Sequence, residues 1–225
     1  MRRVLSLFVL ALTTVLAGCA SAPYMPLADE SSKLDLAKPL FLMTVVVKND
    51  YRQRWQPRIL NVILEKEGGA AKPETLVFRM DSKGTITPDS GSSTYLVRFP
   101  TDAAPHTVRG FNSMASAFPI HGFYFVPLHA SLAKSDGGVY YLGSIRAVIR
   151  ERKDGEFRAG PLIPLIDQAI AGGSTGTFEV EVSDAYDADV ALFRKTFPAL
   201  KDVEVKRSVL PKWERTKAQL FWEQN

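Results

Sequence analysis

The stretch from Gly138 to Arg152 constrains the fold most, because its side chains alternate with a period of two residues. Such alternation is typical of a β-strand, in which successive side chains point to opposite sides of the sheet. Gly143 predicts a bend, since a glycine inside a strand leaves no side chain to pack. We expect one face of this strand to point inward, and it carries Val139, Tyr141, Gly143, Ile145, Ala147 and Ile149.

Further β-type runs, separated by turn residues, occur along most of the chain. They cover residues 40–47, 59–64, 76–80, 94–99, 123–126, 177–183 and 203–209. The run Leu40–Val47 is rich in β-forming residues throughout, which indicates a strand buried on both faces. Strands do not alternate with helices, so a parallel α/β sheet is not expected. The sequence predicts a mainly β fold, an antiparallel β-sandwich of about eight or nine strands.

Helical patterns are confined to short segments, so we expect one or two short peripheral helices. Residues 187–197 place Val190 and Phe193 on one helical face, with Asp184 or Asp187 as the cap at its N-terminus. Further short helices are predicted at residues 162–171 and 211–222, and a loop is predicted at residues 112–119.

An aromatic run at residues 122–125 (Gly-Phe-Tyr-Phe) precedes Gly-Val-Tyr-Tyr-Leu-Gly at residues 138–143 and the long strand. This arrangement is similar to patterns in transthyretin-like and carboxypeptidase-regulatory-like domains, which are small β-sandwiches. The resemblance concerns the fold and by itself implies no activity.

The first residues form a basic and then apolar leader. Residues 1–3 carry two arginines, and residues 4–16 are mostly apolar. A run this short does not span about 30 Å of hydrocarbon as a helix, but it fits the core of a signal peptide. The following Leu16-Ala17-Gly18-Cys19 resembles the lipobox of bacterial lipoproteins. The resemblance implies recognition of Leu16, Ala17 and Gly18 by signal peptidase, cleavage before Cys19, and acylation of the Cys19 thiol and the new amine.

The lipobox resemblance divides the chain into three parts. Residues 1–18 are a signal peptide, residues 19–38 a flexible tether, and residues 39–225 a single β-sandwich domain with a C-terminal extension. Several acyl chains hold a protein to a membrane almost irreversibly. Ala20 follows the cysteine, where an aspartate causes inner-membrane retention in the best-studied sorting system of the family. The resemblance therefore implies an outer-membrane protein facing the periplasm, with the covalent lipid at Cys19 and no other cofactor.

Charge argues against a nucleic-acid partner. Loss of Arg2 and Arg3 with the leader lowers the 28 basic residues to 26, against 24 acidic ones, so the net charge falls from +4 to +2. No basic block is interleaved with aromatic residues, so we expect no nucleic acid to bind. Lipidation of the single cysteine leaves no disulfide. The fold must then depend on its apolar core.

Residues 172–176 (Gly-Gly-Ser-Thr-Gly) match the G-x-S-x-G pattern of the nucleophile elbow in α/β-hydrolases. That elbow requires a strand before the serine, a helix after it and a histidine further along the chain. Here a predicted helix precedes Ser174, a strand follows it, and the last histidine is His129. A flexible glycine loop is the preferred interpretation. An envelope hydrolase that uses Ser174 or a histidine site is kept as an alternative function.

No residue pattern indicates a metal site. The chain has neither free cysteine ligands nor an H-x-x-x-H pair. Its carboxylates do not follow the spacing of a calcium loop, so they are interpreted as helix caps and surface charge. The residues considered are His106, His121 and His129, with the carboxylates Asp184, Asp187, Asp189, Glu179 and Glu181.

Tyr124 and Tyr140 are the remaining candidates for binding. Adjacent aromatic residues on a strand point to opposite faces, so one of each neighbouring pair is expected outside the core. Core packing of the aromatic group is the preferred interpretation, and exposure of Tyr124 or Tyr140 to a partner is the alternative. The predicted function is a non-catalytic domain that binds another envelope component, preferably a protein. Carriage of a small apolar ligand between the sandwich layers is a further alternative.

Overall fold

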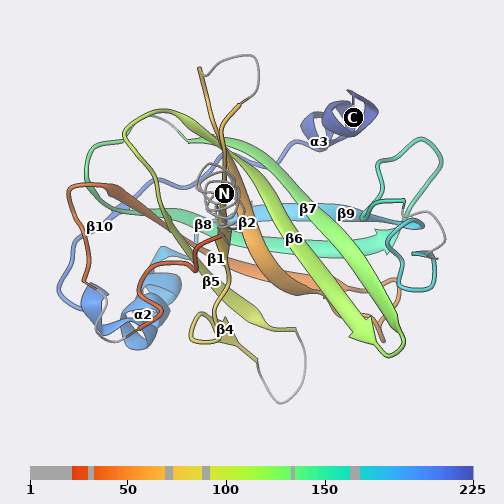
Figure 1. The fold of residues 1–225 in the computed structure, drawn as a ribbon, viewed down its shortest axis with the longest axis horizontal. Helices are drawn as coiled ribbons and strands as arrows, with labels where there is room; N and C mark the ends of the chain where they lie inside the picture. The colour runs from red at the N-terminus through yellow and green to blue at the C-terminus, as the bar shows by residue number, and fades with distance from the viewer. Residues whose placement is uncertain are drawn as a thin grey trace, which may run out of the picture.

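The computed structural model describes residues 22–29, 33–68, 73–87, 92–132, 135–162 and 168–224 (Figure 1). Its strands are β1 (Pro39–Asn49), β2 (Arg58–Lys66), β3 (Thr75–Arg79), β4 (Thr85–Ile86), β5 (Thr94–Pro100), β6 (His106–Ala117), β7 (Ile120–Leu132), β8 (Gly138–Glu151), β9 (Gly176–Ser183) and β10 (Val205–Arg207). Its helices are α2 (Tyr186–Thr196), the 3-10 helix η1 (Pro198–Leu200) and α3 (Arg215–Gln224). The described chain is mainly β, as predicted.

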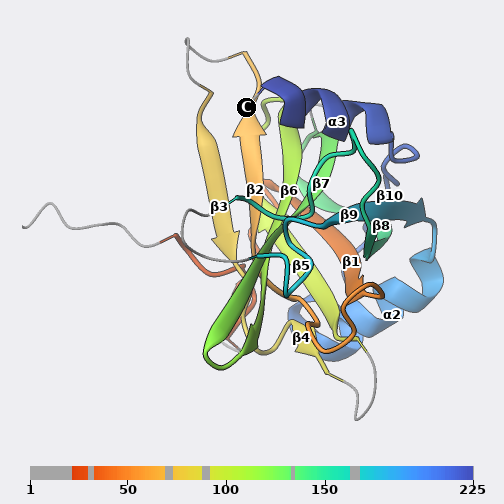
Figure 2. The same ribbon diagram turned by 90° about the vertical axis from the view of Figure 1, so that its right-hand side faces the viewer.

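The strands form two sheets that make separate layers (Figure 2). The six-stranded sheet has the order β10–β8–β1–β5–β4, with β9 also paired to β8, and the four-stranded sheet has the order β3–β2–β6–β7. These two sheets with their short helices confirm the predicted sandwich class. The six-stranded sheet is mixed rather than purely antiparallel, because β1 and β10 both run parallel to β8. The chain between β1 and β8 includes the whole four-stranded sheet, which provides the long connection that a parallel pair needs.

The apolar core has two parts, one on each face of the six-stranded sheet. The main part lies between the two sheets and includes Phe41, Val45, Val62, Phe111 and Val126. The second part lies between the six-stranded sheet and α2 and includes Leu40, Leu42, Val190, Phe193 and Phe197. Strand β1 contributes side chains to both, so it is buried on both faces as predicted.

Strand β8 does not keep one inward face along its length. Gly143 has a φ of 116°, and the register of β8 against β1 shifts next to it. Val139 and Tyr141 consequently pack in the core beside α2, whereas Ile145 and Ile149 pack in the main core. The prediction of an irregularity at Gly143 is confirmed. The prediction of a single inward face is wrong, because one additional residue in a strand exchanges its two sides.

Strand β6 occupies residues 112–117, where the sequence predicts a loop. It pairs with both β2 and β7, so it is a central strand of the four-stranded sheet. The loop prediction fails because this stretch is built from small and polar residues such as Asn112, Ser113 and Ser116, which give no apolar period. Only Phe118 and Pro119 form the turn that connects β6 to β7.

The helices agree with two of the three predicted segments. Helix α2 lies within one residue of the predicted bounds at each end, and α3 begins at Arg215 rather than at residue 211. The N-cap residue of α2 is Ala185, which makes no side-chain cap bond, while the Asp184 carboxylate accepts from the N–H of Tyr186 (3.1 Å). Of the third predicted helix, residues 163–167 lie outside the described residues, and its last residues form a turn.

Part of the predicted flexible tether is packed against the domain. Met25 and Leu27 are only 1% and 3% exposed. The N–H of Met25 donates to the carbonyl of Arg79 (2.9 Å), and the N–H of Arg79 donates to the carbonyl of Pro23 (2.8 Å). The Arg79 guanidinium also lies 4.1 Å from the centre of the Tyr24 ring. The prediction of a flexible tether is therefore wrong for residues 23–27, because two apolar side chains within a polar segment reach the core.

Candidate ligand-binding site

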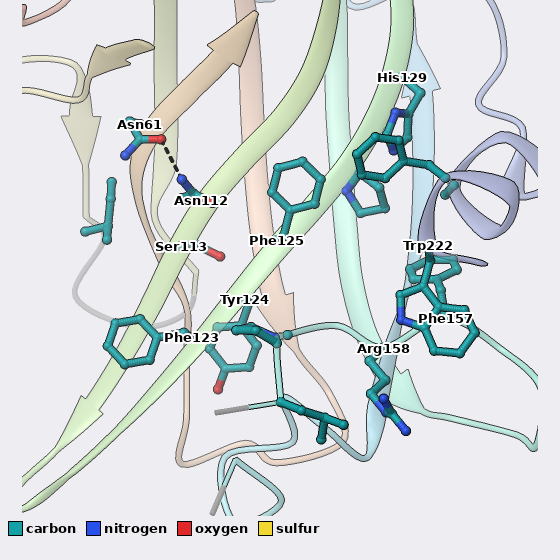
Figure 3. Close-up of a pocket in the computed structure, with 17 residues that line it drawn as sticks. Asn61, Asn112, Ser113, Phe123, Tyr124, Phe125, His129, Phe157, Arg158 and Trp222 are labelled. Carbon is teal, nitrogen blue, oxygen red and sulfur yellow. Dashed lines mark hydrogen bonds between the residues drawn. The ribbon is translucent and has the colours of Figure 1, made fainter. Parts of the chain in front are cut away.

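A pocket of about 680 Å³ lies between β7, the edge strand of the four-stranded sheet, and α3 (Figure 3). Small-molecule sites in proteins usually have about 300–1,000 Å³. The walls are mostly aromatic and aliphatic, and none of the described lining residues is acidic. The residues on which the site depends most are Asn61, Asn112, Phe123, Phe125, Phe157, Arg158, Leu162, Ala218, Phe221 and Trp222.

The free edge of β7 is covered by the segment 157–162, which forms one wall of the pocket. The N–H of Phe125 donates to the carbonyl of Ala159 (2.8 Å), and the N–H of Phe123 donates to the side chain of Gln168 (2.8 Å). Pro127 has no N–H, and its carbonyl accepts from the indole of Trp213 (2.8 Å). These bonds satisfy the polar groups that an edge strand leaves free. They also fix the distance between the wall and the sheet.

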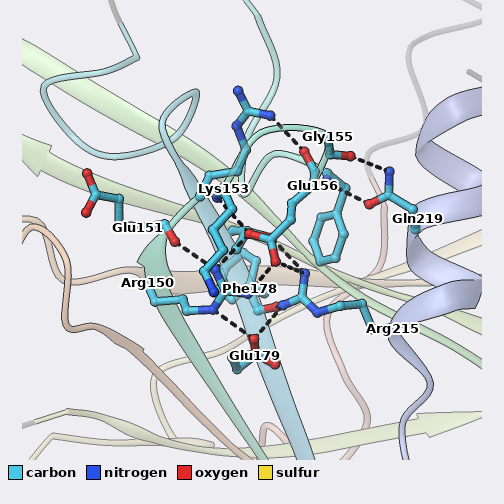
Figure 4. A network of polar contacts seen from close by, with 12 residues as sticks. Arg150, Glu151, Lys153, Gly155, Glu156, Phe178, Glu179, Arg215 and Gln219 are labelled. Atoms are coloured by element: carbon cyan, nitrogen blue, oxygen red, sulfur yellow. Dashed lines mark hydrogen bonds and ion pairs between the residues drawn. The ribbon is translucent and has the colours of Figure 1, made fainter.

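Ion pairs attach α3 to the six-stranded sheet (Figure 4). The Arg150 guanidinium donates to both carboxylate oxygens of Glu156 (2.8 and 2.6 Å) and to Glu179 (2.8 Å). Arg215, the first residue of α3, donates to the same Glu179 carboxylate (2.7 Å). The hydrogen bonds from Arg150 lower the pKa of Glu156 to about 2, so this carboxylate stays charged at neutral pH.

Gln219 makes a second attachment between α3 and the pocket wall. Its side-chain oxygen accepts from the N–H of Phe157 (2.8 Å), and its amide nitrogen donates to the carbonyl of Gly155 (2.8 Å). The helix is therefore held at one fixed position against residues 155–157. That position directs Ala218, Phe221 and Trp222 toward the pocket.

His129 lies in a β-bulge of β7 and belongs to the pocket wall. Leu128 and His129 together face one residue of β6, Arg109, and His129 has a φ of 49°. A bulge redirects a side chain, and here the ring of His129 lies 4.6 Å from the ring of Phe221 in α3. The Arg109 guanidinium is 3.4 Å from Nδ1 of His129. A guanidinium can only donate, so Nδ1 accepts and the imidazole is neutral.

The pocket wall should lose stability in mildly acidic solution because of His129. Burial, and next the Arg109 charge, lower the pKa of His129 to about 4 from its usual 6.5. The neutral ring is thus favoured in the folded state, and its contribution is present above pH 6.5 and is lost as the pH falls toward 4. The loss should be on the order of 3 kcal/mol in the free energy of unfolding. Urea denaturation at several pH values measures it.

The matched variant for this experiment is His129→Asn. Asparagine does not titrate in this range and tolerates the left-handed backbone conformation better than most residues. The variant should be less stable at neutral pH but should show a flatter pH dependence between 6.5 and 4.5. An NMR titration that placed the pKa of His129 above 6 would contradict the expectation.

The two tyrosines predicted as binding residues have different positions. Tyr124 is 2% exposed, and its hydroxyl donates to the carbonyl of Ala171 (2.7 Å), so it packs in the core as the preferred interpretation expects, and the alternative of an exposed Tyr124 is wrong. Its ring lies in the floor of the pocket, on the inner side of β7. Tyr140 is half-buried, its ring lies 5.6 Å from that of Phe41, and its hydroxyl donates to the carbonyl of Asp136 (3.1 Å). Neither side chain projects freely from the surface.

Ser174 belongs to a turn that leads directly into β9. The described residues around it run turn and then strand, which differs from the strand, turn and helix of a nucleophile elbow. Its N–H is 3.5 Å from the carbonyl of Gln168. Gln168 also binds Phe123 of β7, so this turn supports the pocket wall from outside.

The remaining candidate residues make structural contacts. His106 contacts the carbonyl of Ala104 (2.7 Å), and His121 contacts the hydroxyl of Ser116 (2.8 Å). Within the described ranges, no group of three or more His, Cys, Asp or Glu side chains could hold a metal ion.

The carboxylates singled out in the sequence lie at separate places. Asp189 is buried and accepts from the hydroxyl of Tyr141 (2.6 Å). Asp184 pairs with Arg207 (3.1 Å). Asp187 lies in the first turn of α2, and Glu179 and Glu181 are on the exposed side of β9, as predicted.

Leu16, Ala17, Gly18 and Cys19 lie outside the described residues, so the lipobox stays a prediction. None of the helices in the described ranges is both long enough and apolar enough to cross a membrane.

Sequence reasoning missed most of the pocket. Phe157 and Arg158 lie outside every predicted strand and helix, while Phe221 and Trp222 belong only to a predicted peripheral helix. The one available signal was the unusual aromatic content of residues 213–222, which contain two tryptophans and a phenylalanine.

Comparisons with known proteins give little further information. No protein-family model matches the sequence, and no curated protein matches it. One similar solved structure is that of a proposed cell adhesion protein from Bacteroides eggerthii, which is 11% identical, with a TM-score of 0.23. The match covers 64% of this chain and 55% of that protein, so the chain spans about half of its length.

Proposed function

We propose that this chain is a non-catalytic, lipid-anchored protein of the bacterial outer membrane whose domain faces the periplasm. Its pocket between β7 and α3 holds the apolar part of another envelope component, an acyl chain. The observation that carries the proposal is the pocket itself, with about 680 Å³ of space and walls of aromatic and aliphatic side chains. The lipobox of residues 16–19 supports the location.

The chemistry of the rim favours an amphiphile with an acidic head group. Arg158 lines the pocket, and its guanidinium lies 5.6 Å from the ring of Trp222. The described lining contains no carboxylate that would neutralise this charge or repel an anion. Leu162 at the rim is 63% exposed, so an apolar chain can contact it on the way in. A carboxylate or phosphate beside Arg158, with its chain among the aromatic rings, satisfies both parts of the site.

An acyl chain agrees with this geometry better than a folded protein partner does. Protein partners usually bury aromatic anchors on a broad surface, whereas Tyr124 is in the floor of the pocket and Tyr140 is half-buried. The pocket also lies between the edge strand β7 and α3, rather than between the two sheets where an apolar ligand was expected. The site requires no catalytic step: His129 is neutral and packed against Phe221.

The purified lipidated protein should bind a fluorescent palmitate analogue, and Ala218→Phe should weaken this binding at least about tenfold. Ala218 is buried in the wall on α3, so a phenyl ring there occupies the volume that the chain needs. Fluorescence titration measures the dissociation constant. Leu162→Glu, at an exposed position of the rim, should also weaken binding because it places a carboxylate beside the fatty-acid head group.

The control is Ala191→Phe, which adds the same ring at an exposed position of α2 and should leave binding unchanged. Denaturation midpoints verify that the variants are folded. If the wild-type protein failed to bind the probe, or if Ala218→Phe and Leu162→Glu both bound it as well as Ala191→Phe, the proposed ligand class would be wrong.

A further inference from the structure

The outer face of the four-stranded sheet carries apolar side chains among polar and charged ones, and among the described residues it has no layer of its own above it. Side chains alternate along each strand, and Val62, Phe111 and Val126 point into the main core. The alternate positions on these strands point outward. The apolar ones among them are half-buried, and two of them (Phe123 and Phe125) line the pocket; the set is Ile63, Val77, Met114, Phe123 and Phe125. Asn61 and Asn112 lie among them and satisfy one another, since Asn112 donates to Asn61 (3.1 Å).

The two outer faces of the sandwich differ in this respect. On the six-stranded sheet, α2 and η1 cover Leu40, Leu42 and Tyr141 and complete a second core. On the four-stranded sheet, α3 covers only the side near β7, where the pocket lies (Figure 2).

The packed N-terminal segment begins at the edge of this same face. Arg79 of β3 pairs with Asn61, so its side chain is on the outer side, and the ring of Tyr24 stacks on its guanidinium. Pro23 is hydrogen-bonded to Arg79 through its carbonyl. Only three residues lie between Cys19 and Pro23, and a fully extended chain covers at most about 3.5 Å per step, or about 14 Å over the four steps. A lipid on Cys19 therefore keeps this edge close to the bilayer.

The charges on this outer face and the composition of the β6–β7 hairpin both suit contact with a membrane surface. Arg58 is exposed beside Met114 on the outer face, and Glu65 of that face is paired with Arg109 (2.6 Å). The β6–β7 hairpin contains no charged residue from Asn112 to Phe123, and Phe118 at its tip is 94% exposed. Aromatic side chains at an uncharged tip are favoured at the membrane–water interface, and arginine is favoured beside anionic lipid head groups.

We propose that the outer face of the four-stranded sheet lies against a bilayer containing anionic phospholipid, so that the pocket beside β7 receives its acyl chain from that bilayer. This inference rests on the lipid anchor of the proposed function. It gives a reason for the apolar side chains on the uncovered part of this face, for the uncharged hairpin and for the packing of residues 23–27, which keeps this edge within about 14 Å of Cys19.

The test uses the lipidated protein in vesicles of phosphatidylethanolamine and phosphatidylglycerol that contain a nitroxide-labelled lipid. Because the lipid occupies the thiol of Cys19, a single introduced cysteine can carry a fluorophore, at Ser116→Cys on the outer face of β6 or at Glu181→Cys on the exposed side of β9. Fluorescence at position 116 should be quenched by the nitroxide, and fluorescence at position 181 should remain unquenched. Equal quenching at both positions would overturn the assignment of the face.

Charge variants test whether anionic lipid contributes to the docking of this face. Arg58→Gln should reduce the docked population about fivefold, because a basic residue near an anionic surface contributes on that scale. Lys201→Gln, an exposed charge beyond α2, should have no effect on quenching. Equal effects of the two variants would overturn the role of Arg58.

The two proposals fail in different ways. A protein whose mass shows no acyl chains, and which does not stay with the vesicles, would overturn the anchor and with it this inference. A lipidated protein with equal quenching at both positions would overturn the membrane-facing sheet alone.

Discussion

Replacing Cys19 by serine should remove the mature protein from the membrane fraction, or leave it there only as an uncleaved precursor. The lipid is joined to sulfur in the family that the lipobox resembles, and a hydroxyl does not take its place. Each buried methylene of an acyl chain contributes about 0.8 kcal/mol to membrane binding, so loss of several chains removes nearly all of the attachment.

Cell fractionation followed by mass spectrometry of the N-terminal peptide measures the result. The mass distinguishes a precursor that retains residues 1–18 from a cleaved chain, and it shows whether acyl chains are present. Ser21→Ala is the matched control, since it alters a neighbouring hydroxyl without touching the cysteine, and it should be processed like the wild type. A Cys19→Ser protein that was cleaved and still membrane-bound would contradict the lipobox prediction.

The parts of the fold that were predictable are those with a repeated apolar signal. Strand β1 and helix α2 have such a signal, and both are found close to their predicted bounds. Strand β6 lacks it, because its inward and outward positions hold residues such as Ser113 and Asn112. The pairing partners β2 and β7 make it a strand, so the information lies in neighbours that are distant in sequence. The same applies to the parallel pair β1–β8.

The site was less predictable than the fold because its walls come from separate parts of the chain. Phe123 and Phe125 of β7 meet Phe157 and Trp222 only after β7 pairs with the 157–162 segment and α3 is attached through its residues Gln219 and Arg215. Tyr124 shows the limit of strand alternation. The two-residue period correctly places Tyr124 on the opposite face of the strand from Phe123 and Phe125. It does not say which of the two faces is buried, and in the structure the face that carries Tyr124 is the inner one.

Substitution of Gly160 by alanine should open the pocket and abolish most binding of the palmitate analogue. A Cβ atom at this position would lie 2.0 Å from the carbonyl oxygen of Phe123 and 3.2 Å from the Cα of Gly173, and both of these are backbone atoms that cannot turn aside. The 157–162 segment would have to move away from β7. We expect a destabilisation of about 3 kcal/mol and at least about tenfold weaker binding.

Hydrogen exchange gives a direct measurement of this displacement. The N–H of Phe125 donates to Ala159 (2.8 Å), so its amide should exchange much faster in Gly160→Ala, while amides in β1 and β8 should stay protected. Pro161→Ala is the control: it changes an exposed neighbour of the same wall and should shift stability by no more than about 0.5 kcal/mol. If the Phe125 amide remained protected while binding was lost, displacement of the 157–162 segment from β7 would not be the cause of the lost binding. If binding persisted with Phe125 exposed, the acyl chain would not depend on this wall, and the pocket would have to be assigned to another ligand.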